Sequence, residues 1–397
     1  MFTRESKTIL FVTGLSHFAI HYSMLVFPAV RLVLREEFGA ELDILGWVGG
    51  LAGFMFGLGA IPAGWLESKL GGRSLLLICQ CGMALAGLTA FLAQNLLQLT
   101  VALFLLGLSA SIYHPAGLTL ISKRIRKMSR ALGYHGIAGS MGLAAGWVVA
   151  AWLATHFSWR IAYGLVVLFF SVLAVITTML VPSRRRSAPE IEATSPTETR
   201  LHPLVVYYVI VILVGLSFYG LNYLPVHFSE HSGGILRNID GVFRSGLLTT
   251  FVFVAGVVGQ IVGGRMGDKY DRTKLLTLIL FLNVPFLVTI SYATGSWLLV
   301  SAICLGVTHF ALQPVGNSLI AEFTRSPSRG LGYGVSFFLS FGAGSLAEPI
   351  GGFLAVHYGV EKLFLLLAVA LTAALFLSIY LRRISSSDPV RNRVLRQ

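Results

Sequence analysis

The sequence predicts an all-α integral membrane protein with twelve transmembrane helices, arranged as two six-helix parallel repeats. The first observation is composition: the 397 residues are 55% hydrophobic and only 12% charged, whereas a soluble domain has about 25% charged residues. The second is a set of twelve apolar runs, each long enough to cross a hydrocarbon core of ~30 Å as a helix. The third is that segments of the first half recur in the second.

The first half of the chain contains six of these apolar runs. The first run carries His17 and His21 and recurs in the second half, so we do not expect it to be a cleaved signal peptide. A helix satisfies its own backbone hydrogen bonds inside the bilayer, which makes each run a predicted span. The six spans are expected near residues 8–34, 44–66, 74–93, 97–122, 133–156 and 160–181.

The second half is a diverged copy of the first. Four short segments recur in the same order at offsets of 199 to 201 residues, for example GLSHFAIHY (14–22) as GLSFYGLNY (215–223). Chance matches between short strings would not keep both order and spacing. The six spans of this half are expected near residues 204–229, 243–265, 274–293, 296–321, 331–356 and 361–382.

The two repeats are separated by a charged segment rich in Pro, Ser and Thr, which is typical of a flexible linker. Because each half has an even number of spans, the copies have the same orientation, and a binding site is expected between them near the midplane. The predicted organisation is an N-terminal six-helix domain (1–182), a cytoplasmic linker (183–203), a C-terminal six-helix domain (204–384) and a cytoplasmic tail (385–397).

The distribution of basic residues predicts the orientation in the membrane. Of the 30 Lys and Arg residues, 24 fall on the side that carries both termini; Arg31, at the end of the first span, is counted on the other side. The positive-inside rule therefore predicts a multi-pass protein of the bacterial inner membrane with both termini cytoplasmic. The excess of Lys and Arg in loops that face anionic lipid also accounts for the net charge of +13, so we expect no nucleic-acid partner.

Nothing in the sequence indicates covalent catalysis. It has no GxxxxGK[ST], GxSxG or HExxH motif and no water-exposed domain large enough for an active site, so we expect no enzyme activity and no cofactor. Cys79, Cys81 and Cys304 lie inside spans and are expected to be small core side chains rather than a disulfide or metal site. Energy should come from an ion gradient rather than ATP.

The loop after the second span, and its copy after the eighth, resemble the Gly-x-x-x-Asp-Arg/Lys-x-Gly-Arg-Arg/Lys pattern of the major facilitator superfamily. The later copy fits at Gly264, Asp268, Lys269, Arg272 and Lys274; the earlier one fits at Gly64, Lys69, Gly71 and Arg73, with Ser68 in the acidic position. With the duplication, the resemblance covers nearly the whole chain and implies the major facilitator fold.

A carboxylate at a helix end, paired with Arg or Lys, can hold one closed state of a rocking transporter. Alternatively, these loop charges only obey the positive-inside rule. The candidate gating residues are Ser68, Lys69, Arg73, Asp268 and Arg272.

Three further segments resemble the fosmidomycin-resistance group of drug exporters. They are SHFAIHYSMLVFPAV (16–30), GLSASIYHPAG (107–117) and YHGIAGSMG (134–142). The chain departs from that group at Ile20 and His21, where the group tends to have Asn-Asp, and at Ala116, where it tends to have Glu. The substrate and its coupling can differ accordingly.

Histidine is unusually frequent inside the predicted spans. His17 and His21 are four residues apart and share a helix face, and the family fold places helices 1 and 4 along the central cavity. Such residues can bind a polar or anionic substrate, carry a proton or coordinate a metal; hydrogen bonds between packed helices are the alternative. With the repeat equivalents of His21, Tyr22 and His114, the candidate substrate-binding residues are His17, His21, Tyr22, His114, His135, Asn222, Tyr223, His309 and Gln313.

Glu348 is the only acidic residue deep inside a predicted span. A low dielectric disfavours the charged form of a carboxyl group, which suits a proton-coupling site, and His21 is the second candidate for that role. A structural glutamate bonded to the backbone beside Pro349 is the alternative.

These features favour a secondary active transporter that exports a small polar or anionic compound, such as a drug or metabolite, in exchange for protons by alternating access. An alternative is a metal-ion or metal-chelate transporter that uses the intramembrane histidines. A hypothesis of another class is a non-transporting membrane receptor or assembly subunit. The expected partners are a small-molecule substrate, protons and the lipid bilayer, and we expect a monomer.

Overall fold

The computed structural model describes residues 2–125, 128–183, 198–325 and 329–386. Twelve helical segments in this part of the chain are long and apolar enough to cross a membrane, which confirms the predicted all-α, twelve-span fold. Most of the expected linker (183–203) and nearly all of the expected tail (385–397) lie outside the described residues. The helices of the first half are α1 (Arg4–Phe38), α2 (Leu42–Leu58), α3 (Ala60–Leu70), α4 (Gly72–Phe91), α5 (Leu96–Ser111), α6 (Tyr113–Arg124), α7 (Met128–His156) and α8 (Trp159–Leu180).

The second half repeats this arrangement. Its α-helices are α9 (Leu201–Gly220), α10 (Leu224–His231), α11 (Gly241–Lys269), α12 (Arg272–Tyr292), α13 (Gly295–Phe323), α14 (Arg329–Phe337), α15 (Ala347–His357) and α16 (Glu361–Ser386).

The helices extend beyond the apolar runs that predict them. Helix α1 begins after Thr3, whose side chain accepts a hydrogen bond from the backbone N–H of Ser6, and ends at Gly39, which has φ +58°. Apolarity marks only the part of a helix that lies in hydrocarbon, whereas capping residues set its ends.

Four spans are each built from two consecutive helices, and a proline follows each interruption, although Pro28, Pro285 and Pro314 lie inside continuous helices. A proline cannot donate a backbone hydrogen bond, and its ring clashes with the carbonyl four residues earlier. Three breaks fall at those carbonyl positions: α2 ends at Leu58, α5 ends at Ser111, and a 3₁₀ turn covers Leu221–Tyr223. The fourth, made of π and 3₁₀ turns over Phe338–Leu346, includes that position but begins further upstream. The corresponding prolines are Pro62, Pro115, Pro225 and Pro349.

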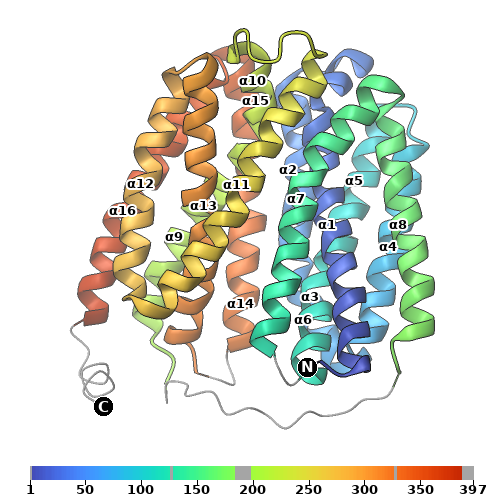
Figure 1. Ribbon diagram of the computed structural model, residues 1–397, viewed down its shortest axis with the longest axis vertical. Helices are drawn as coiled ribbons and strands as arrows, with labels where there is room; N and C mark the ends of the chain where they lie inside the picture. The colour runs from blue at the N-terminus through green and yellow to red at the C-terminus, as the bar shows by residue number, and fades with distance from the viewer. Residues whose placement is uncertain (1, 126–127, 184–197, 326–328, 387–397) are drawn as a thin grey trace.

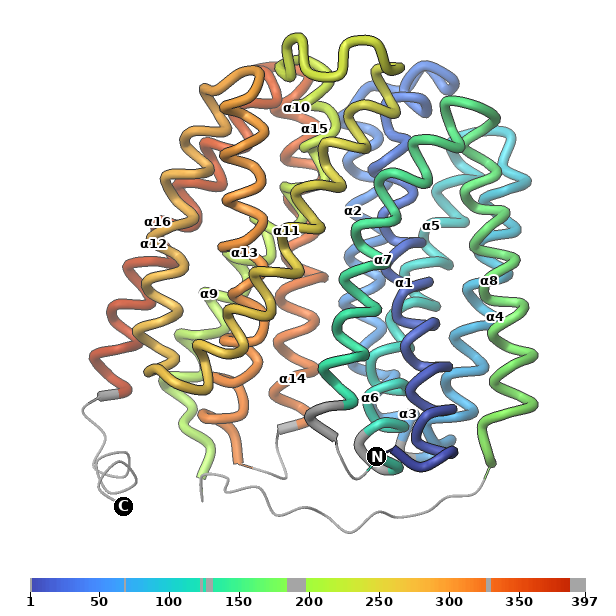
Figure 2. The backbone as a smooth tube through the Cα atoms, in the orientation of Figure 1, coloured from blue at the N-terminus to red at the C-terminus, as the bar shows by residue number. Residues whose placement is uncertain are grey.

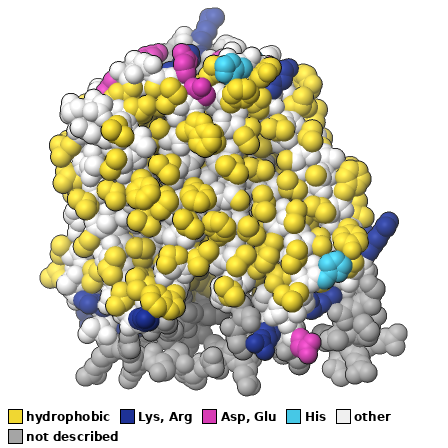
Figure 3. All heavy atoms as spheres, turned by 180° about the vertical axis from the view of Figure 1, so that it is seen from behind, with side chains coloured by type: hydrophobic (Ala, Val, Ile, Leu, Met, Phe, Trp, Pro, Cys, Tyr) yellow, Lys and Arg dark blue, Asp and Glu magenta, His cyan; other side chains and the backbone are white. Residues whose placement is uncertain are grey.

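The two halves form two helix bundles that stand side by side (Figure 1). The start of α1 and the end of α16 both lie at the lower end of the view, here called the terminal end; the other is the opposite end. The bundles meet where α7 packs on α11 and α2 packs on α15 (Figure 2). The face in Figure 3 is covered by apolar side chains across its middle, with charged residues near its upper and lower margins, as expected for a protein surrounded by lipid.

Close contacts between helices depend on glycine. On α11, a Cβ at Gly259 would overlap the carbonyl oxygen of Val307 on α13. On α5, one at Gly107 would overlap the carbonyl oxygen of Ala52 on α2. Small residues at such positions let membrane helices approach closely, where dispersion forces replace the hydrophobic effect.

We expect Gly259→Ala to lower the thermal unfolding temperature of the detergent-solubilised protein, because overpacking costs about 1–3 kcal/mol and outweighs the gain of up to about 1 kcal/mol in helix propensity. Gly267→Ala, on the same helix, is the matched control, since its Cβ would meet only Val315 Cγ2 at 3.9 Å. Equal unfolding temperatures for the two variants would contradict this account of the α11–α13 contact.

Candidate functional site

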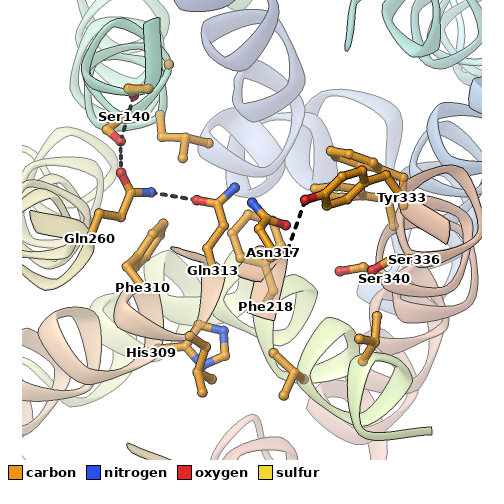
Figure 4. A pocket seen from close by; sticks show the side chains of 18 of the residues that line it. Ser140, Phe218, Gln260, His309, Phe310, Gln313, Asn317, Tyr333, Ser336 and Ser340 are labelled. Atoms are coloured by element: carbon orange, nitrogen blue, oxygen red, sulfur yellow. Dashed lines mark hydrogen bonds between the residues drawn. The ribbon is translucent and has the colours of Figure 1, made fainter. Parts of the chain in front are cut away.

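A cavity of about 190 Å³ lies between the two bundles, well above the ~10–15 Å³ that one water molecule needs on the same measure. Its walls come from both halves, and it extends from the middle of the molecule toward the terminal end. The polar and aromatic residues that line it include His17, His21 and Ser140 from the first half and Phe218, Gln260, His309, Phe310, Gln313, Asn317, Tyr333, Ser336 and Ser340 from the second (Figure 4).

A hydrogen-bonded chain crosses the cavity wall between the halves. Ser140 Oγ on α7 donates to Gln260 Oε1 on α11 at 2.6 Å, and Gln260 Nε2 donates to Gln313 Oε1 on α13 at 2.8 Å (Figure 4). Both glutamines line the cavity, and each amide has hydrogen-bonding capacity beyond these bonds with which it can contact a ligand that carries polar groups.

Four histidines form a cluster on the first-half side of the cavity. His17 Nδ1 lies 2.8 Å from the carbonyl oxygen of His135, and because a carbonyl only accepts, Nδ1 carries the proton. In neutral His17 the Nε2 atom is therefore the acceptor, and it lies 3.0 Å from His21 Nε2. His135 stacks on His17 with ring centroids 4.0 Å apart.

The last member, His114, stands at the start of α6, directly after the break at Ser111 and before Pro115. Its ring lies 5.2 Å from that of His17 and stacks at 5.0 Å on Phe337, which lines the cavity. One ring nitrogen from each of His17, His21 and His114 lies within 4.8 Å of the other two, so a single metal ion could contact all three after rotation of the rings.

A buried ion pair joins the halves on the other side of the midplane. The Arg31 guanidinium on α1 contacts the Glu348 carboxylate on α15, and the two side chains are 0% and 2% exposed. Asn222 Nδ2 donates to Glu348 Oε1 at 2.6 Å, and Tyr223 OH donates to the Glu348 backbone carbonyl at 2.7 Å. The Tyr223 ring lies 4.1 Å from Arg31, so it adds a cation–π contact.

The structure corrects the interpretation of Arg31. The sequence analysis counted it with the loop charges, whereas its side chain is fully buried between the halves. The physical reason is that α1 continues to Phe38, so position 31 lies inside the span and faces the other bundle. Nε and Nη1 of Arg31 have no hydrogen-bond partner among the described residues, which leaves Glu348 as its main counter-charge.

Three of the candidate gating residues, Lys69, Arg73 and Arg272, contact their own half of the chain. Arg73 donates to the carbonyl oxygens of Val181 and Thr178 at 2.7 and 3.0 Å, and Lys69 Nζ lies 3.8 Å from the Trp65 ring. In the second half, Arg272 pairs with Glu322 at 3.3 Å. Asp268 is exposed, and the side chain of Ser68 lies outside what the structure describes.

The structure brings together some of the candidate substrate-binding residues and separates others. His17, His21, His309 and Gln313 line the cavity, while His114 and His135 contact His17 from behind. Tyr22 lies inside the first bundle, where its hydroxyl is 3.3 Å from the Ala162 carbonyl. Asn222 and Tyr223 lie with Glu348 rather than on the cavity wall.

The sequence analysis missed several polar residues on the wall. Gln260, Asn317 and Tyr333 are uncharged and occur within apolar spans outside the segments quoted above, whereas Ser140 lies in the segment 134–142 but was not singled out there. Gln260 had one available signal: it is the only glutamine or asparagine in its span, residues 243–265.

Comparison with known proteins agrees with this architecture. A sequence model described as the Major Facilitator Superfamily matches residues 9–236 and 235–397. The multidrug resistance protein MdtG of Klebsiella pneumoniae (strain 342) is 27% identical over 359 residues, which cover 86% of this chain and 85% of that protein. A probable 4-methylmuconolactone transporter of Cupriavidus pinatubonensis is 26% identical over 365 residues, covering 86% and 82%.

The fosmidomycin resistance protein of Escherichia coli (strain K12) is 24% identical over 377 residues, covering 91% of this chain and 89% of that protein, and it confirms the resemblance seen in the sequence. Among solved structures, a peptide transporter in complex with alafosfalin superposes with a TM-score of 0.74 at 12% identity, covering 95% of this chain and 94% of that chain. The human organic anion transporter MFSD10 gives 0.71 at 15% identity, covering 95% and 100%. These structures share the fold.

We expect Arg31→Met and Glu348→Gln each to destabilise the protein by about 3–5 kcal/mol, because each leaves a buried group without its partner. The double variant should cost less than the sum of the two, since it leaves neither charge behind. Unfolding in detergent measures all three, and strictly additive costs would contradict a direct Arg31–Glu348 interaction.

Proposed function

Because the chain belongs to the Major Facilitator Superfamily, whose members are membrane transporters rather than enzymes, we propose that it exports a small polar or anionic compound in exchange for protons, by alternating access. One observation carries the proposal: the cavity lies between the halves on the terminal side of the midplane, and the buried Arg31–Glu348 pair joins the halves on the other side. A site between two parallel repeats, closed toward one end, is what alternating access requires.

The packing at the opposite end supports a rocking motion of two rigid bundles. Helix α15 packs closely on α2, because a Cβ at Gly352 would overlap backbone atoms of Leu42 and Asp43. Helix α11 packs closely on α7, because a Cβ at Gly246 would crowd the backbone carbonyl oxygen of Trp147. At the rim, Thr155 Oγ1 donates to Asp240 Oδ1 at 3.1 Å. Opening this end must separate these contacts together, because each joins one bundle to the other.

The chemistry of the cavity wall supports a polar or anionic substrate. None of the described residues that line it is Asp, Glu, Lys or Arg, so a cationic substrate would find no counter-charge there. Imidazole and amide groups can instead donate hydrogen bonds to oxygen atoms of a ligand. Phe218, Phe310 and Phe341 add apolar surface, as is usual for small-molecule sites.

Export is supported by the names of two relatives, a multidrug resistance protein and a fosmidomycin resistance protein. Under this proposal the terminal end is cytoplasmic, as the distribution of Lys and Arg predicts, and the cavity accepts substrate from the cytoplasm. The protein would act as a monomer in a bacterial inner membrane, because the cavity is completed by the two halves of one chain.

Proton coupling is assigned to Glu348. While the opposite end is closed, the Arg31 guanidinium contacts the Glu348 carboxylate. Opening that end separates the pair, and the carboxylate, having lost its counter-charge, takes up a proton from the outside. Closure lets Arg31 displace the proton toward the cavity, where His21 is the next candidate acceptor. The proton thus moves inward as the substrate moves outward.

Ser68, Lys69, Arg73, Asp268 and Arg272 would act at the terminal end in the other state. In the structure Arg73 and Arg272 bind partners within their own bundles, so they hold each bundle rigid. Asp268 is exposed and available for contact with the other half when the terminal end closes.

We expect the double variant Thr155→Cys/Asp240→Cys, in a chain whose Cys79, Cys81 and Cys304 are replaced by Ala, to lose transport when an oxidant forms the cross-link. The disulfide would hold the opposite end closed. Efflux from proteoliposomes, measured before oxidation, after it and after reduction, tests this. Each single cysteine variant is a control, and unimpaired efflux by the cross-linked protein would contradict alternating access at this interface.

Glu348→Gln should abolish proton-driven flux and retain substrate–substrate exchange, because the amide cannot release a proton but can still occupy the site. Counterflow and pH-gradient-driven flux in proteoliposomes separate the two activities. The matched control is Glu322→Gln, which removes an Arg-paired carboxylate that lies within one bundle. Unchanged proton-driven flux in Glu348→Gln would refute the assignment.

A further inference from the structure

We propose that His17, His21 and His114 form a binding site for a divalent transition-metal ion on the cavity wall, and that the exported compound is a metal-chelating anion. The second statement rests on the proposed function, whereas the metal site stands on the geometry of the three imidazoles.

The spacing of the three side chains suits one ion. His17 and His21 are four residues apart on α1, so both rings lie on the same face, and His114 reaches them from the start of α6. Their nearest ring nitrogens lie within 4.8 Å of one another, and those of His17 and His21 are 3.0 Å apart. Zinc–imidazole bonds of about 2.0–2.1 Å place ligand nitrogens about 3.4 Å apart in a tetrahedral site, so small rotations suffice.

The surroundings of His17 already orient it as a ligand. Its Nδ1–H donates to the His135 carbonyl oxygen, so the lone pair of Nε2 points to the cluster. A metal-ligating histidine typically has this arrangement, in which the second nitrogen is held by a carbonyl or carboxylate. His135 is fixed in turn, because its Nε2 lies 2.8 Å from the Tyr113 hydroxyl, which donates to the Thr13 carbonyl.

His114 supplies an independent observation. Its Nε2 is buried and has no hydrogen-bond partner among the described residues. Because His227 Nδ1 and His309 Nδ1 are also buried without a partner, this observation points to a ligand only together with the spacing of the three rings. A metal ion between the three rings would satisfy His114 Nε2.

Charge determines what else the site must hold. The three imidazoles are neutral ligands, and neither the cluster nor the described residues lining the cavity include a carboxylate, so a bound dication would leave a double positive charge in the membrane interior. Three protein ligands also leave one position of a tetrahedral ion open. Because His17 and His21 line the cavity, that position faces the substrate space, where an anionic oxygen of the cargo supplies both the missing ligand and the missing charge.

The test is a titration of the purified, full-length protein with Co²⁺, using an affinity tag without histidine. Tetrahedral Co²⁺ has an intense visible absorption band, and Zn²⁺ competes for the same site. We expect one Co²⁺ per chain with this band, and an affinity for Co²⁺ at least about 100-fold lower in His114→Ala. Loss of a residue that only orients a metal ligand lowers metal affinity by about 10–100-fold, and loss of a ligand itself should lower it by more.

His114→Ala removes no protein hydrogen bond of Nε2, so the variant should fold; His21→Gln, which keeps an amide at the cavity wall, is the second variant. The matched control is His309→Ala, which removes a buried histidine from the facing wall of the same cavity and should leave the band unchanged. Any Co²⁺ binding by surface histidines is the same in the unaltered protein and in these three variants, so it cancels in the comparison. Absence of the band in the unaltered protein, or its persistence in folded His114→Ala or His21→Gln, would overturn the metal site.

Flux is measured separately, so the two proposals can fail independently. Efflux of a chelating anion that rises with added Zn²⁺, and loses that dependence in His114→Ala, supports the assignment of the cargo. Metal binding without any flux contradicts the proposed transport but keeps the site. Flux that is the same with Zn²⁺ and with a stronger external chelator contradicts the cargo assignment.

Discussion

The arrangement of the two bundles depends on one buried ion pair. Removing a guanidinium and a carboxylate from water costs several kcal/mol per ion, and the cost is met only if the geometry and the accompanying hydrogen bonds are good. Here Asn222 occupies the second carboxylate oxygen, and the Tyr223 ring faces the guanidinium. Because Arg31 belongs to one bundle and the other three residues to its partner, the network is complete only when the opposite end is closed.

The helix interruptions make this network possible. Asn222 lies in the 3₁₀ turn that precedes Pro225, and Glu348 follows the π and 3₁₀ turns that precede Pro349. Glycines on α2 allow the approach: a Cβ at Gly46 would overlap the Glu348 carbonyl oxygen, and one at Gly49 would lie 3.3 Å from Glu348 Oε2. Interrupted helices at a site near the midplane are a general device of transporters, since they free backbone groups and redirect side chains.

The helices could be predicted from sequence because the length of an apolar run follows directly from the thickness of the bilayer. The proximity of His17 and His21 could be predicted because residues four apart lie on the same face of a helix. The role of Arg31 could not be predicted. A charge near the end of an apolar run looks the same whether it faces water or a partner across the bundle interface, and only packing distinguishes them. Repeat symmetry placed Asn222 and Tyr223 opposite His21 and Tyr22, but the break before Pro225 turns them toward Glu348 instead. Single polar residues such as Gln260 carry no periodic signal.

The two halves have diverged into different chemistries, and α1 connects them. The first half supplies the histidine cluster beside the cavity, and the second supplies the carboxylate near the opposite end. His21 and Arg31 are ten residues apart on the same helix, or about 15 Å at 1.5 Å per residue. Helix α1 is continuous between them although it contains Pro28, and it packs along α7. Under the proposed function, a ligand that pulls on the histidines would therefore also shift the guanidinium. In the proposed cycle, coupling between cavity occupancy and closure of the opposite end would then follow from the placement of both groups on one continuous helix, because the histidines lie at the cavity and Arg31 contacts the other bundle.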